Sequence, residues 1–524
     1  MRKSLSRAVL GATVLSLAAL GLPASATAAT AAPERSVTDI VPLPVQAKAD
    51  PKANFTLSPL TVIRAGKGTN QVADYLRGLL RPATGYPLPV VPVNAGLPAI
   101  SLDLGHADSR VGTEGYQLSV AKSGVTLQAN TADGLFEGVQ SLRQLLPSAI
   151  EAKSVQFRKW TIAGGTVLDY PRFGTRGAML DVARHFFNPA QVKTYIDQLA
   201  QYKINTLHLH LADDQGWRIE IKSWPRLATE GGKGAADGDP GGYYTQAQYK
   251  DIVAYAASRH ISIVPEIDMP GHTNAAQSVY AELNCDGVAV PPRTDTEVGY
   301  SSLCIDSPTT YKFVEDVIRE LAAITPGKYL GIGGDEAHST SDPDYKAFYA
   351  KVNPLVAKYG KLITGWHEIA KSDLPATAMP EYWDQGGANP DLAAFAARGG
   401  KVLMAPSNHA YLDMKYTEDT PLGQDWAGLV EVKDSYDWDP ATLVPGVGES
   451  SVSGVEAPLW TETIRTNDNI EYMAFPRLPG LAEIGWSQQS GRDWDTYRVR
   501  LAKQSPRWVA QGIDFYRSPQ VDWK

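Results

Sequence analysis

The stretch KYLGIGGDE, residues 328–336, carries most of the information about fold and chemistry in this chain. Its first half predicts a short buried strand, and the two glycines that follow predict a turn where the strand ends. Two adjacent carboxylates, Asp335 and Glu336, come directly after that turn. Because glycines at a strand exit relax the alternation of side chains, both acids can face one ligand. Taken alone, the stretch also fits a solvated acidic turn.

The sequence on both sides of this stretch favours a barrel of parallel strands. From Thr175 onward, short apolar runs alternate with amphipathic segments, which is typical of a parallel sheet with crossover helices. Eight candidate strands lie at residues 177–181, 206–211, 261–265, 329–332, 362–366, 381–383, 402–405 and 454–460. Expected helices between them include residues 189–202, 245–259 and 310–325. This α/β pattern predicts a (β/α)8 TIM barrel with some long loops.

The residues that precede the barrel follow a different pattern. Short β-like runs at 55–57, 61–64, 116–120 and 125–129 accompany two helix-like segments, 71–80 and 133–146. This mixture predicts a smaller α+β domain, and no repeat of the length that marks solenoid arrays is present. The expected division is a signal peptide at 1–32, an N-terminal α+β domain at 34–172 and a barrel domain at 173–524.

Residues 1–32 have the organisation of a secretory signal peptide. Three basic residues within the first seven precede an apolar run, residues 8–22, and the small-residue sequence ASATA follows it. The run is short for a membrane span, and no later stretch reaches about 18 uninterrupted apolar residues. The mature protein is therefore expected to be exported and soluble, without a membrane partner.

The chain has two cysteines, Cys285 and Cys304. In an oxidising compartment this pair predicts a disulfide that closes one long loop. In the chain-entropy model such a loop closure stabilises the fold by about 3 kcal/mol. Two free thiols are the alternative.

Charge and aromatic content narrow the class of function. The 49 basic and 57 acidic residues give a net charge of -8, and neither sign forms long runs. This distribution argues against nucleic acid or a membrane surface as a partner. Eleven of the 12 tryptophans lie beyond residue 200, in the predicted barrel.

Polar and aromatic side chains gather where the predicted strands end, which is where active sites of TIM barrels lie. In chain order they are Arg184, His185, Asp213, Asp214, Glu266, Asp268, His272, Asp335, Glu336, Trp366, Trp383, Tyr411, Asp413, Trp460 and Glu462. Sugar C–H faces stack on tryptophan, and sugar hydroxyls pair with carboxylates and arginine, so the mixture predicts a pyranose pocket. Packing roles for single tryptophans, and a hydrogen-bonded interior role for His208 and His210, are the alternatives.

Four ordered segments resemble the signature sequences of glycoside hydrolase family 20, the β-N-acetylhexosaminidases, and most closely its secreted actinobacterial members. The segments are DVARHF at 181–186, HLHLADDQ at 208–215, EIDMPGH at 266–272 and GGDE at 333–336. The resemblance covers nearly the whole mature chain and implies an N-terminal α+β domain followed by a catalytic TIM barrel. One position departs from the family pattern: Gly331 stands where the family usually has a histidine, which implies a missing imidazole beneath the catalytic loop.

The resemblance implies exo-acting, retaining hydrolysis of terminal β-linked GlcNAc or GalNAc from oligosaccharides such as chitin fragments. In this mechanism the 2-acetamido oxygen of the substrate attacks the anomeric carbon and forms an oxazolinium intermediate. The matching positions imply that Glu336 is the general acid and base, Asp335 binds the acetamido N–H, and Tyr411 binds the acetamido oxygen. The residues matching the family's substrate contacts are Arg184, Trp366, Trp383, Asp413, Trp426, Trp460 and Glu462. Asp213 and His272 match a polar chain that orients Glu336, and the family needs no cofactor or metal.

Two other classes of function compete with this interpretation. His208 and His210 form a pair that binds metal in some barrels, which would make the protein a metal-dependent hydrolase. Among the strand-exit residues named above that follow this pair, however, only His272 adds an imidazole. A non-enzymatic glycan-binding protein would be favoured if either carboxylate were missing, and both are present. The sequence leaves the oligomeric state and the preference between GlcNAc and GalNAc open.

Overall fold

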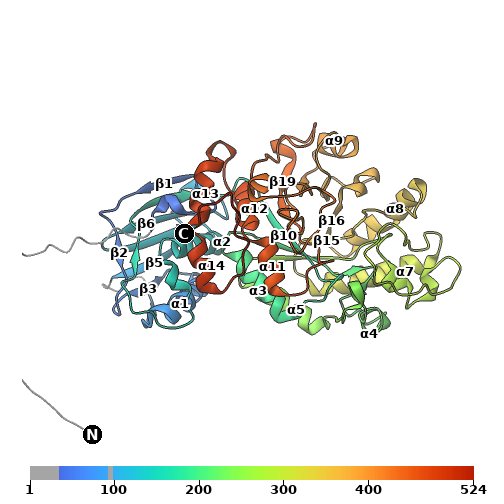
Figure 1. The fold of residues 1–524 in the computed structure, drawn as a ribbon, viewed down its shortest axis with the longest axis horizontal. Helices are drawn as coiled ribbons and strands as arrows, with labels where there is room; N and C mark the ends of the chain where they lie inside the picture. Colours follow the sequence, from blue (N-terminus) through green and yellow to red (C-terminus); the bar gives the residue numbers. More distant parts are fainter. Residues whose placement is uncertain (1–34, 93–97, 524) are drawn as a thin grey trace, which may run out of the picture. The chain divides into compact units, whose positions relative to one another are not determined.

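The computed structural model describes residues 35–92 and 98–523 (Figure 1). The predicted signal peptide, residues 1–32, lies outside the described residues. The N-terminal part is built on a seven-stranded sheet in the order β1-β9-β6-β7-β5-β3-β4. Its strands are β1 (Gln46–Ala49), β3 (Val62–Ala65), β4 (Val90–Val91), β5 (Ala99–Leu104), β6 (Tyr116–Ala121), β7 (Gly124–Ala129) and β9 (Gly165–Asp169). A separate pair is formed by β2 (Phe55–Thr56) and β8 (Thr161–Ile162).

Two helices pack against this sheet, α1 (Asn70–Thr84) and α2 (Ala132–Gln144). Leu76 of α1 and Val139 of α2 belong to the same buried cluster as Leu127 of β7. Helix α2 begins at a cap in which the Thr131 side chain accepts a hydrogen bond from the Gly134 amide. The α+β character that the sequence predicted for this part is confirmed.

Eight parallel strands form a closed barrel, as the sequence predicted. They are β10 (Thr175–Asp181), β11 (Thr206–His210), β14 (Ser262–Glu266), β15 (Tyr329–Gly331), β16 (Leu362–Trp366), β17 (Met379–Tyr382), β18 (Val402–Met404) and β19 (Val452–Ala457). The last strand ends three residues earlier than expected, directly before Pro458, which has no N–H to continue the ladder. Trp383 likewise lies just past its strand rather than within it.

Helices surround the barrel and connect its strands. The longer ones are α3 (Pro189–Ala200), α5 (Gln246–Ala257), α7 (Pro308–Ile324), α8 (Asp342–Lys358), α9 (Pro390–Ala397), α11 (Asn467–Ala474) and α12 (Arg477–Trp486). Short helices occupy the loops, namely α4 (Arg226–Thr229), α6 (Asn274–Gln277) and α10 (Val432–Tyr436). Three of the longer helices begin at a capped proline-containing turn, in which Ser307, Ser341 and Asn389 are the caps.

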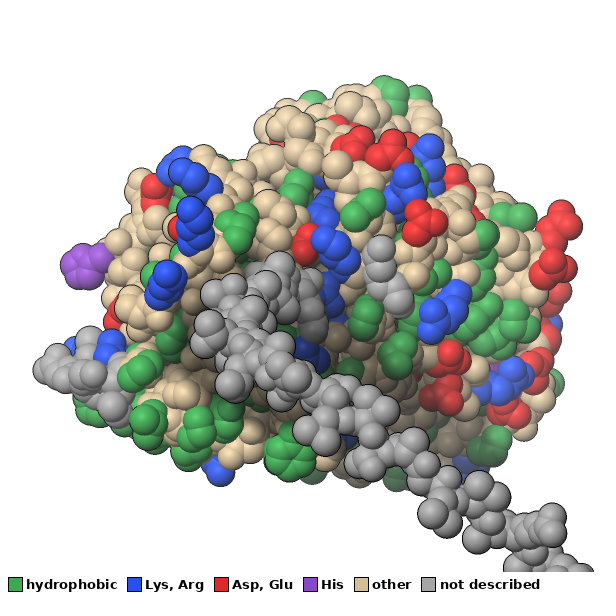
Figure 2. Space-filling model, turned by 60° about the vertical axis from the view of Figure 1, so that its left-hand side comes forward, with side chains coloured by type: hydrophobic (Ala, Val, Ile, Leu, Met, Phe, Trp, Pro, Cys, Tyr) green, Lys and Arg blue, Asp and Glu red, His purple; other side chains and the backbone are tan. Residues whose placement is uncertain are grey.

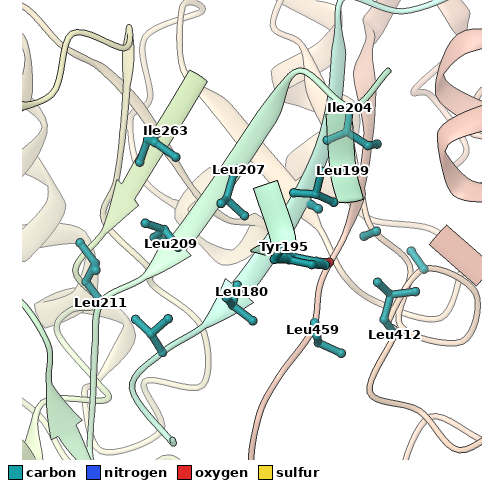
Figure 3. Packing of buried hydrophobic residues seen from close by; sticks show 14 of the residues in the cluster. Leu180, Tyr195, Leu199, Ile204, Leu207, Leu209, Leu211, Ile263, Leu412 and Leu459 are labelled. Atoms are coloured by element: carbon teal, nitrogen blue, oxygen red, sulfur yellow. The ribbon is translucent and has the colours of Figure 1, made fainter. Parts of the chain in front are cut away.

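Strand β11 divides its side chains between two environments. Leu207 and Leu209 pack in the hydrophobic cluster that contains Tyr195 and Leu199 of helix α3 (Figure 3). The alternate residues, His208 and His210, both contact Glu266 in the interior of the barrel. This is the two-residue alternation of a strand, and it places buried charges inside the barrel and leucines outside it.

The C-terminal helices return to the N-terminal part, as Figure 1 shows for α13 (Trp494–Ala502) and α14 (Ser505–Gln511). Arg507 of α14 forms an ion pair with Glu151. Trp486, at the end of α12, lies in the core cluster of the N-terminal sheet and donates a 2.9 Å hydrogen bond to Asp169. The predicted boundary near residue 172 stays a prediction, although β9 ends at Asp169 and β10 begins at Thr175.

The surface carries charges of both signs. On the face drawn in Figure 2, lysine and arginine side chains are interspersed with aspartate and glutamate. Within the described part of the chain, none of the helices has the length and apolar character that spanning a membrane demands.

Candidate active site

A cavity of about 440 Å³ opens where the barrel strands run out at their carboxyl ends. Of the predicted site residues, those lining it are Arg184, Asp335, Glu336, Trp383, Tyr411, Asp413, Trp426, Trp460 and Glu462. They come from loops after five different strands, β10, β15, β17, β18 and β19, and are far apart in the sequence. The fold therefore brings nine predicted residues to a single cavity.

Glycines shape the turn that carries the two acids. Gly333 and Gly334 have φ of 62° and 106°, backbone conformations that residues other than glycine rarely adopt. A Cβ at Gly333 would lie 1.7 Å from Asp268 Oδ1, so no other residue fits there. Asp268 in turn accepts a 2.9 Å hydrogen bond from the Gly334 amide. The turn is thus fixed from below by a buried carboxylate.

Glu336 is the strained residue of this turn. Its φ is 44°, a left-handed conformation that is costly for a glutamate, and such outliers concentrate at functional sites. The Glu336 side chain is 28% exposed, whereas that of Asp335 is 9% exposed. The two acids therefore differ in environment: one opens to solvent and the other is enclosed.

Behind the acids lies a chain of buried charges. His272 Nδ1 is 3.1 Å from Asp213 Oδ1, and His272 Nε2 is 3.5 Å from Glu336 Oε2. Asp213 Oδ2 pairs with the Arg184 guanidinium at 2.9 Å. Burial opposes charge on Asp213, but Arg184 and His272 outweigh it and hold the Asp213 pKa well below its usual range. His272 thus lies beside Glu336, and Asp213 lies behind His272.

Aromatic rings form one wall of the cavity. The Trp366 and Trp460 rings lie 5.4 Å apart between centroids, and the Arg184 guanidinium lies 4.8 Å above Trp460. Trp366 is buried behind Trp460 and is not among the lining residues. Trp383 and Trp426 pack edge to face at 6.0 Å, and Trp426 is 51% exposed. Trp426 therefore stands at the rim rather than at the floor.

Several buried polar atoms around the cavity have no hydrogen-bond partner within the described residues. They are Asp335 Oδ1, Asp413 Oδ2, Glu462 Oε2, Arg184 Nε and Trp366 Nε1. A buried polar atom without a partner costs about 1–3 kcal/mol. This concentration of unpaired donors and acceptors indicates a site organised to receive a polar ligand.

Burial also controls the protonation of the site. It raises the pKa of Asp335 well above the usual range, and the neighbouring Asp268 carboxylate adds to the rise. Asp413 behaves in the same way, because burial and the nearby Glu462 both raise its pKa. Carboxyl groups that keep a proton can donate hydrogen bonds to a ligand as well as accept them.

The histidines that suggested a metal centre are engaged with carboxylates. His208 contacts Glu456 through Nδ1 at 2.8 Å and Glu266 through Nε2 at 2.6 Å. His210 contacts Glu266 through Nδ1 and Asp213 through Nε2, both at 2.8 Å. Carboxylates raise the pKa of His210 to about 9 although burial alone would lower it. Imidazoles with protons on both nitrogens have no lone pair for a metal.

The space beneath the catalytic turn is filled despite the glycine at 331. A Cβ on Gly331 would lie 2.7 Å from the Cβ of Glu266, so the Glu266 side chain occupies that region. His208 and His210 hold Glu266 in place. No imidazole is therefore present at position 331, and the stem of Glu266, whose carboxylate has two imidazole partners, packs against this glycine.

Three lining residues were missed by sequence reasoning: Thr296, Val298 and Gln424. The first two belong to the loop between Cys285 and Cys304, which form a disulfide, as predicted. Threonine and valine are not residue types from which a sequence predicts a binding site. The cysteine spacing indicated a pinned loop but not that the loop reaches the cavity.

Fold and cavity together are those of a carbohydrate-active TIM-barrel enzyme, and comparison with known proteins specifies the family. The family model "Glycosyl hydrolase family 20, catalytic domain" matches residues 173–344 and 338–489. The model "Glycosyl hydrolase family 20, domain 2" matches residues 37–170. Together the two models cover most of the chain.

Individual proteins that resemble this chain are β-N-acetylhexosaminidases. The β-N-acetylhexosaminidase of Cellulomonas fimi is 39% identical over 486 residues, which cover 92% of this chain and 97% of that protein. The solved enzyme of Streptomyces coelicolor A3(2) is 54% identical with a TM-score of 0.90, covering 94% of this chain and 99% of that one. Streptomyces plicatus N-acetyl-β-hexosaminidase, solved with thio-NAG-glucal, is 56% identical with the same TM-score and coverage. The chain belongs to glycoside hydrolase family 20 and is a glycoside hydrolase.

Proposed function

We propose that the protein is an exo-acting, retaining β-N-acetylhexosaminidase that removes terminal β-linked GlcNAc or GalNAc by substrate-assisted catalysis. The observation that carries the proposal is the Asp335-Glu336 pair, in which one acid is enclosed and the other opens to the cavity. The similar Streptomyces plicatus enzyme has been solved with the product GlcNAc. A ligand of that class suits the polar and aromatic lining described above.

Glu336 is assigned the proton transfers. It protonates the glycosidic oxygen of the leaving group, and in the second step it removes a proton from the attacking water. His272, 3.5 Å from Glu336 Oε2, orients the carboxyl and is itself held by Asp213. The strained backbone at Glu336 aims the side chain at the cavity rather than along the strand.

Asp335 and Tyr411 are assigned to the acetamido group. The attacking atom is the acetamido oxygen of the substrate. Asp335 hydrogen-bonds the acetamido N–H, and the positive charge that develops on the oxazolinium ring lowers the Asp335 pKa, so that the ionised carboxylate balances this charge. Tyr411, which lines the same cavity, donates to the acetamido oxygen. Because the nucleophile is part of the bound substrate, the reaction needs no encounter between two molecules. The effective concentration of a nucleophile held in this way reaches about 10⁵ M or more.

The remaining lining residues hold the sugar ring. Arg184, Asp413 and Glu462 are assigned to the ring hydroxyls, because their orphaned polar atoms lie buried beside the cavity. Trp460 and Trp383, backed by Trp366, enclose the acetamido methyl and the sugar face. Because these side chains close the end of the pocket around the ring hydroxyls, the pocket accepts only the terminal sugar of an oligosaccharide.

The products formed from the tetramer of β-1,4-linked GlcNAc test the proposal. We expect GlcNAc to be released from the first minutes, with trimer and dimer appearing in that order. Release of dimer before monomer would contradict the exo mode. An assay with para-nitrophenyl GlcNAc and GalNAc, which differ only at C4, measures the preference between the two sugars.

Export of the protein is proposed as well, on the basis of the signal-peptide pattern at residues 1–32. Detection of the activity in culture medium, and its retention inside cells when residues 1–32 are deleted, would support export. Equal distribution of both forms would contradict it.

A further inference from the structure

The hydrogen bonds behind Glu336 continue into the interior of the barrel. From His272 they pass to Asp213, whose Oδ2 contacts His210 Nε2 at 2.8 Å. His210 Nδ1 and His208 Nε2 both contact Glu266 Oε2, at 2.8 and 2.6 Å. The chain thus alternates imidazole and carboxylate at every step. None of these groups is more than 5% exposed.

The chain ends at two glutamates, one on β19 and one on β17, which lies opposite β11 in the barrel. His208 Nδ1 contacts Glu456 Oε1 of β19 at 2.8 Å, whereas Glu381 Oε2 of β17 is 3.9 Å from the same nitrogen. Carboxylate oxygens of Glu381 and Glu456 lie within 4.8 Å of each other. Both residues are 2% exposed. We call Glu381 and Glu456 the floor pair.

Two buried carboxylates this close together do not both ionise, because like charges repel strongly at low dielectric. One proton shared by the pair removes that repulsion. Glu456 Oε1 lies 2.8 Å from His208 Nδ1, whereas Glu381, at 3.9 Å, is the carboxyl farther from the imidazole and keeps the proton. Burial and the charge on Glu456 raise the pKa of Glu381 well above its usual range.

We propose that the floor pair shares one proton, and that Glu381, Glu456 and His208 are positioning residues that act on Glu336 through the buried chain. The proposal deepens the proposed function, because it rests on Glu336 being the catalytic acid. The single negative charge of the floor pair keeps His208 protonated. His208 in turn fixes Glu266, and Glu266 fixes His210 and through it Asp213.

The surroundings of the floor pair contribute few other charges. The titratable groups that face it are His208 of β11, Glu266 of β14, Tyr411 from the loop after β18 and Tyr195 of α3. Strand β10 presents Gly177, where an added Cβ would lie 2.2 Å from Glu456 Oε2. The charge of the pair is therefore transmitted toward the site mainly through His208.

A divalent cation is the competing explanation for clustered carboxylates. His208, Glu381 and Glu456 each offer an atom within 4.8 Å of the others. Both nitrogens of His208, however, already contact carboxylate oxygens within 2.8 Å, so a metal would have to displace one of these hydrogen bonds. A shared proton keeps every contact that the structure shows.

The pH dependence of kcat in glutamine variants of the floor pair tests the proposal. With one shared proton, Glu381→Gln and Glu456→Gln each leave one carboxyl, which ionises and restores the charge of the pair. We expect both single variants to keep the parental pH profile. The double variant loses the charge, so the basic limb of its profile should move to lower pH by at least about 0.5 unit. KM at the optimum should change little, because no residue of the pair lines the cavity.

Two outcomes of this comparison would overturn the proposal. Additive shifts in the two single variants would mean that both carboxylates are charged in the parent. A double variant with the parental profile would mean that the floor pair does not act on the reaction.

Infrared difference spectra between the parent and each single variant provide a second measurement that needs no double variant. Carbonyl bands of other protonated carboxyl groups cancel in the difference, whereas the band of the floor pair, present at neutral pH in the parent, should be lost in both single variants and so appear in both difference spectra. Difference spectra that lack this band for both variants, or a stoichiometric divalent metal in the purified parent that is lost in the variants, would overturn the shared proton. If instead Glu336→Gln proves fully active, the proposed role of Glu336 fails, but the infrared band is unaffected, so the two failures are distinguishable.

Discussion

His272 and Asp213 are joined by a hydrogen bond of 3.1 Å that ties the loop after strand β14 to the loop after strand β11. Burial alone would lower the pKa of His272, but the Asp213 and Asp335 carboxylates outweigh it and raise that pKa well above its usual range. The imidazole is therefore charged at neutral pH, and its Nδ1–H is fixed by Asp213. This contact links the catalytic turn to the interior of the barrel.

Replacing Asp213 by asparagine should lower kcat by about 10²-fold, because displacement of a catalytic group by even about 1 Å has an effect of that size. KM should change much less. Steady-state kinetics on a substrate with a poor leaving group provide the measurement. Asp214→Asn is the matched control, because Asp214 hydrogen-bonds Ser301 and the Asn274 backbone amide, whereas its Oδ2 lies 4.0 Å from His272 Nδ1, beyond hydrogen-bond distance. Equal losses of kcat in both variants would contradict a specific role for Asp213.

Replacing Glu336 by glutamine should reduce turnover by about 10²–10⁴-fold on oligosaccharides, which need protonation of the leaving oxygen. Aryl glycosides with acidic phenols need less help, so cleavage of their glycosidic bond should be impaired less. A comparison of kcat/KM across phenols of different acidity measures this difference. Equal losses on all leaving groups would remove Glu336 as the acid.

The sequence predicts the barrel strands, but it does not predict residues whose position depends on loop folding or on closure of the barrel. The strands are recovered because an apolar run such as residues 362–366 has no other stable environment than a buried sheet. Asp335 and Glu336 stand out because polar and aromatic residues also follow the other predicted strands, which a single acidic turn does not explain. Thr296 and Val298 were not recovered, because their position depends on how a long loop folds over the barrel. The floor pair was missed for a related reason: Glu381 meets Glu456 only once the barrel closes.

Opening the disulfide should affect binding more than folding. The loop between Cys285 and Cys304 carries Thr296 and Val298 to the cavity, and neither cysteine belongs to a barrel strand. In a Cys285→Ser/Cys304→Ser variant, KM for oligosaccharides should rise, and the free energy of unfolding should fall by about 3 kcal/mol or less. Kinetics and denaturant unfolding measure both effects. An unfolded variant would show that the bond supports the barrel itself.

The contact between the C-terminal helices and the N-terminal part should weaken in acid. Burial alone would raise the pKa of Glu151, but Arg143 and Arg507 outweigh it and lower that pKa to about 2. A lowered pKa stabilises the fold fully above the unfolded value of about 4.3, and this contribution is lost as the pH falls toward about 2. Glu151→Gln should therefore lower Tm at pH 7 and have a smaller effect near pH 3. An equal drop in Tm at both values would contradict the ion-pair account.

The central claim is that the acetamido oxygen of the substrate is the nucleophile and that Asp335 and Tyr411 act through it. A series of aryl glycosides whose N-acetyl group carries none, one, two or three fluorines tests this most directly. Fluorine withdraws electrons from the attacking oxygen but leaves the shape of the sugar nearly unchanged. The account predicts that kcat/KM falls steeply with each fluorine, and that the matching glucoside is nearly inert. A kcat/KM that is insensitive to fluorine, together with a covalent glycosyl ester trapped on Asp335 or Glu336, would contradict it and establish the two-carboxylate route.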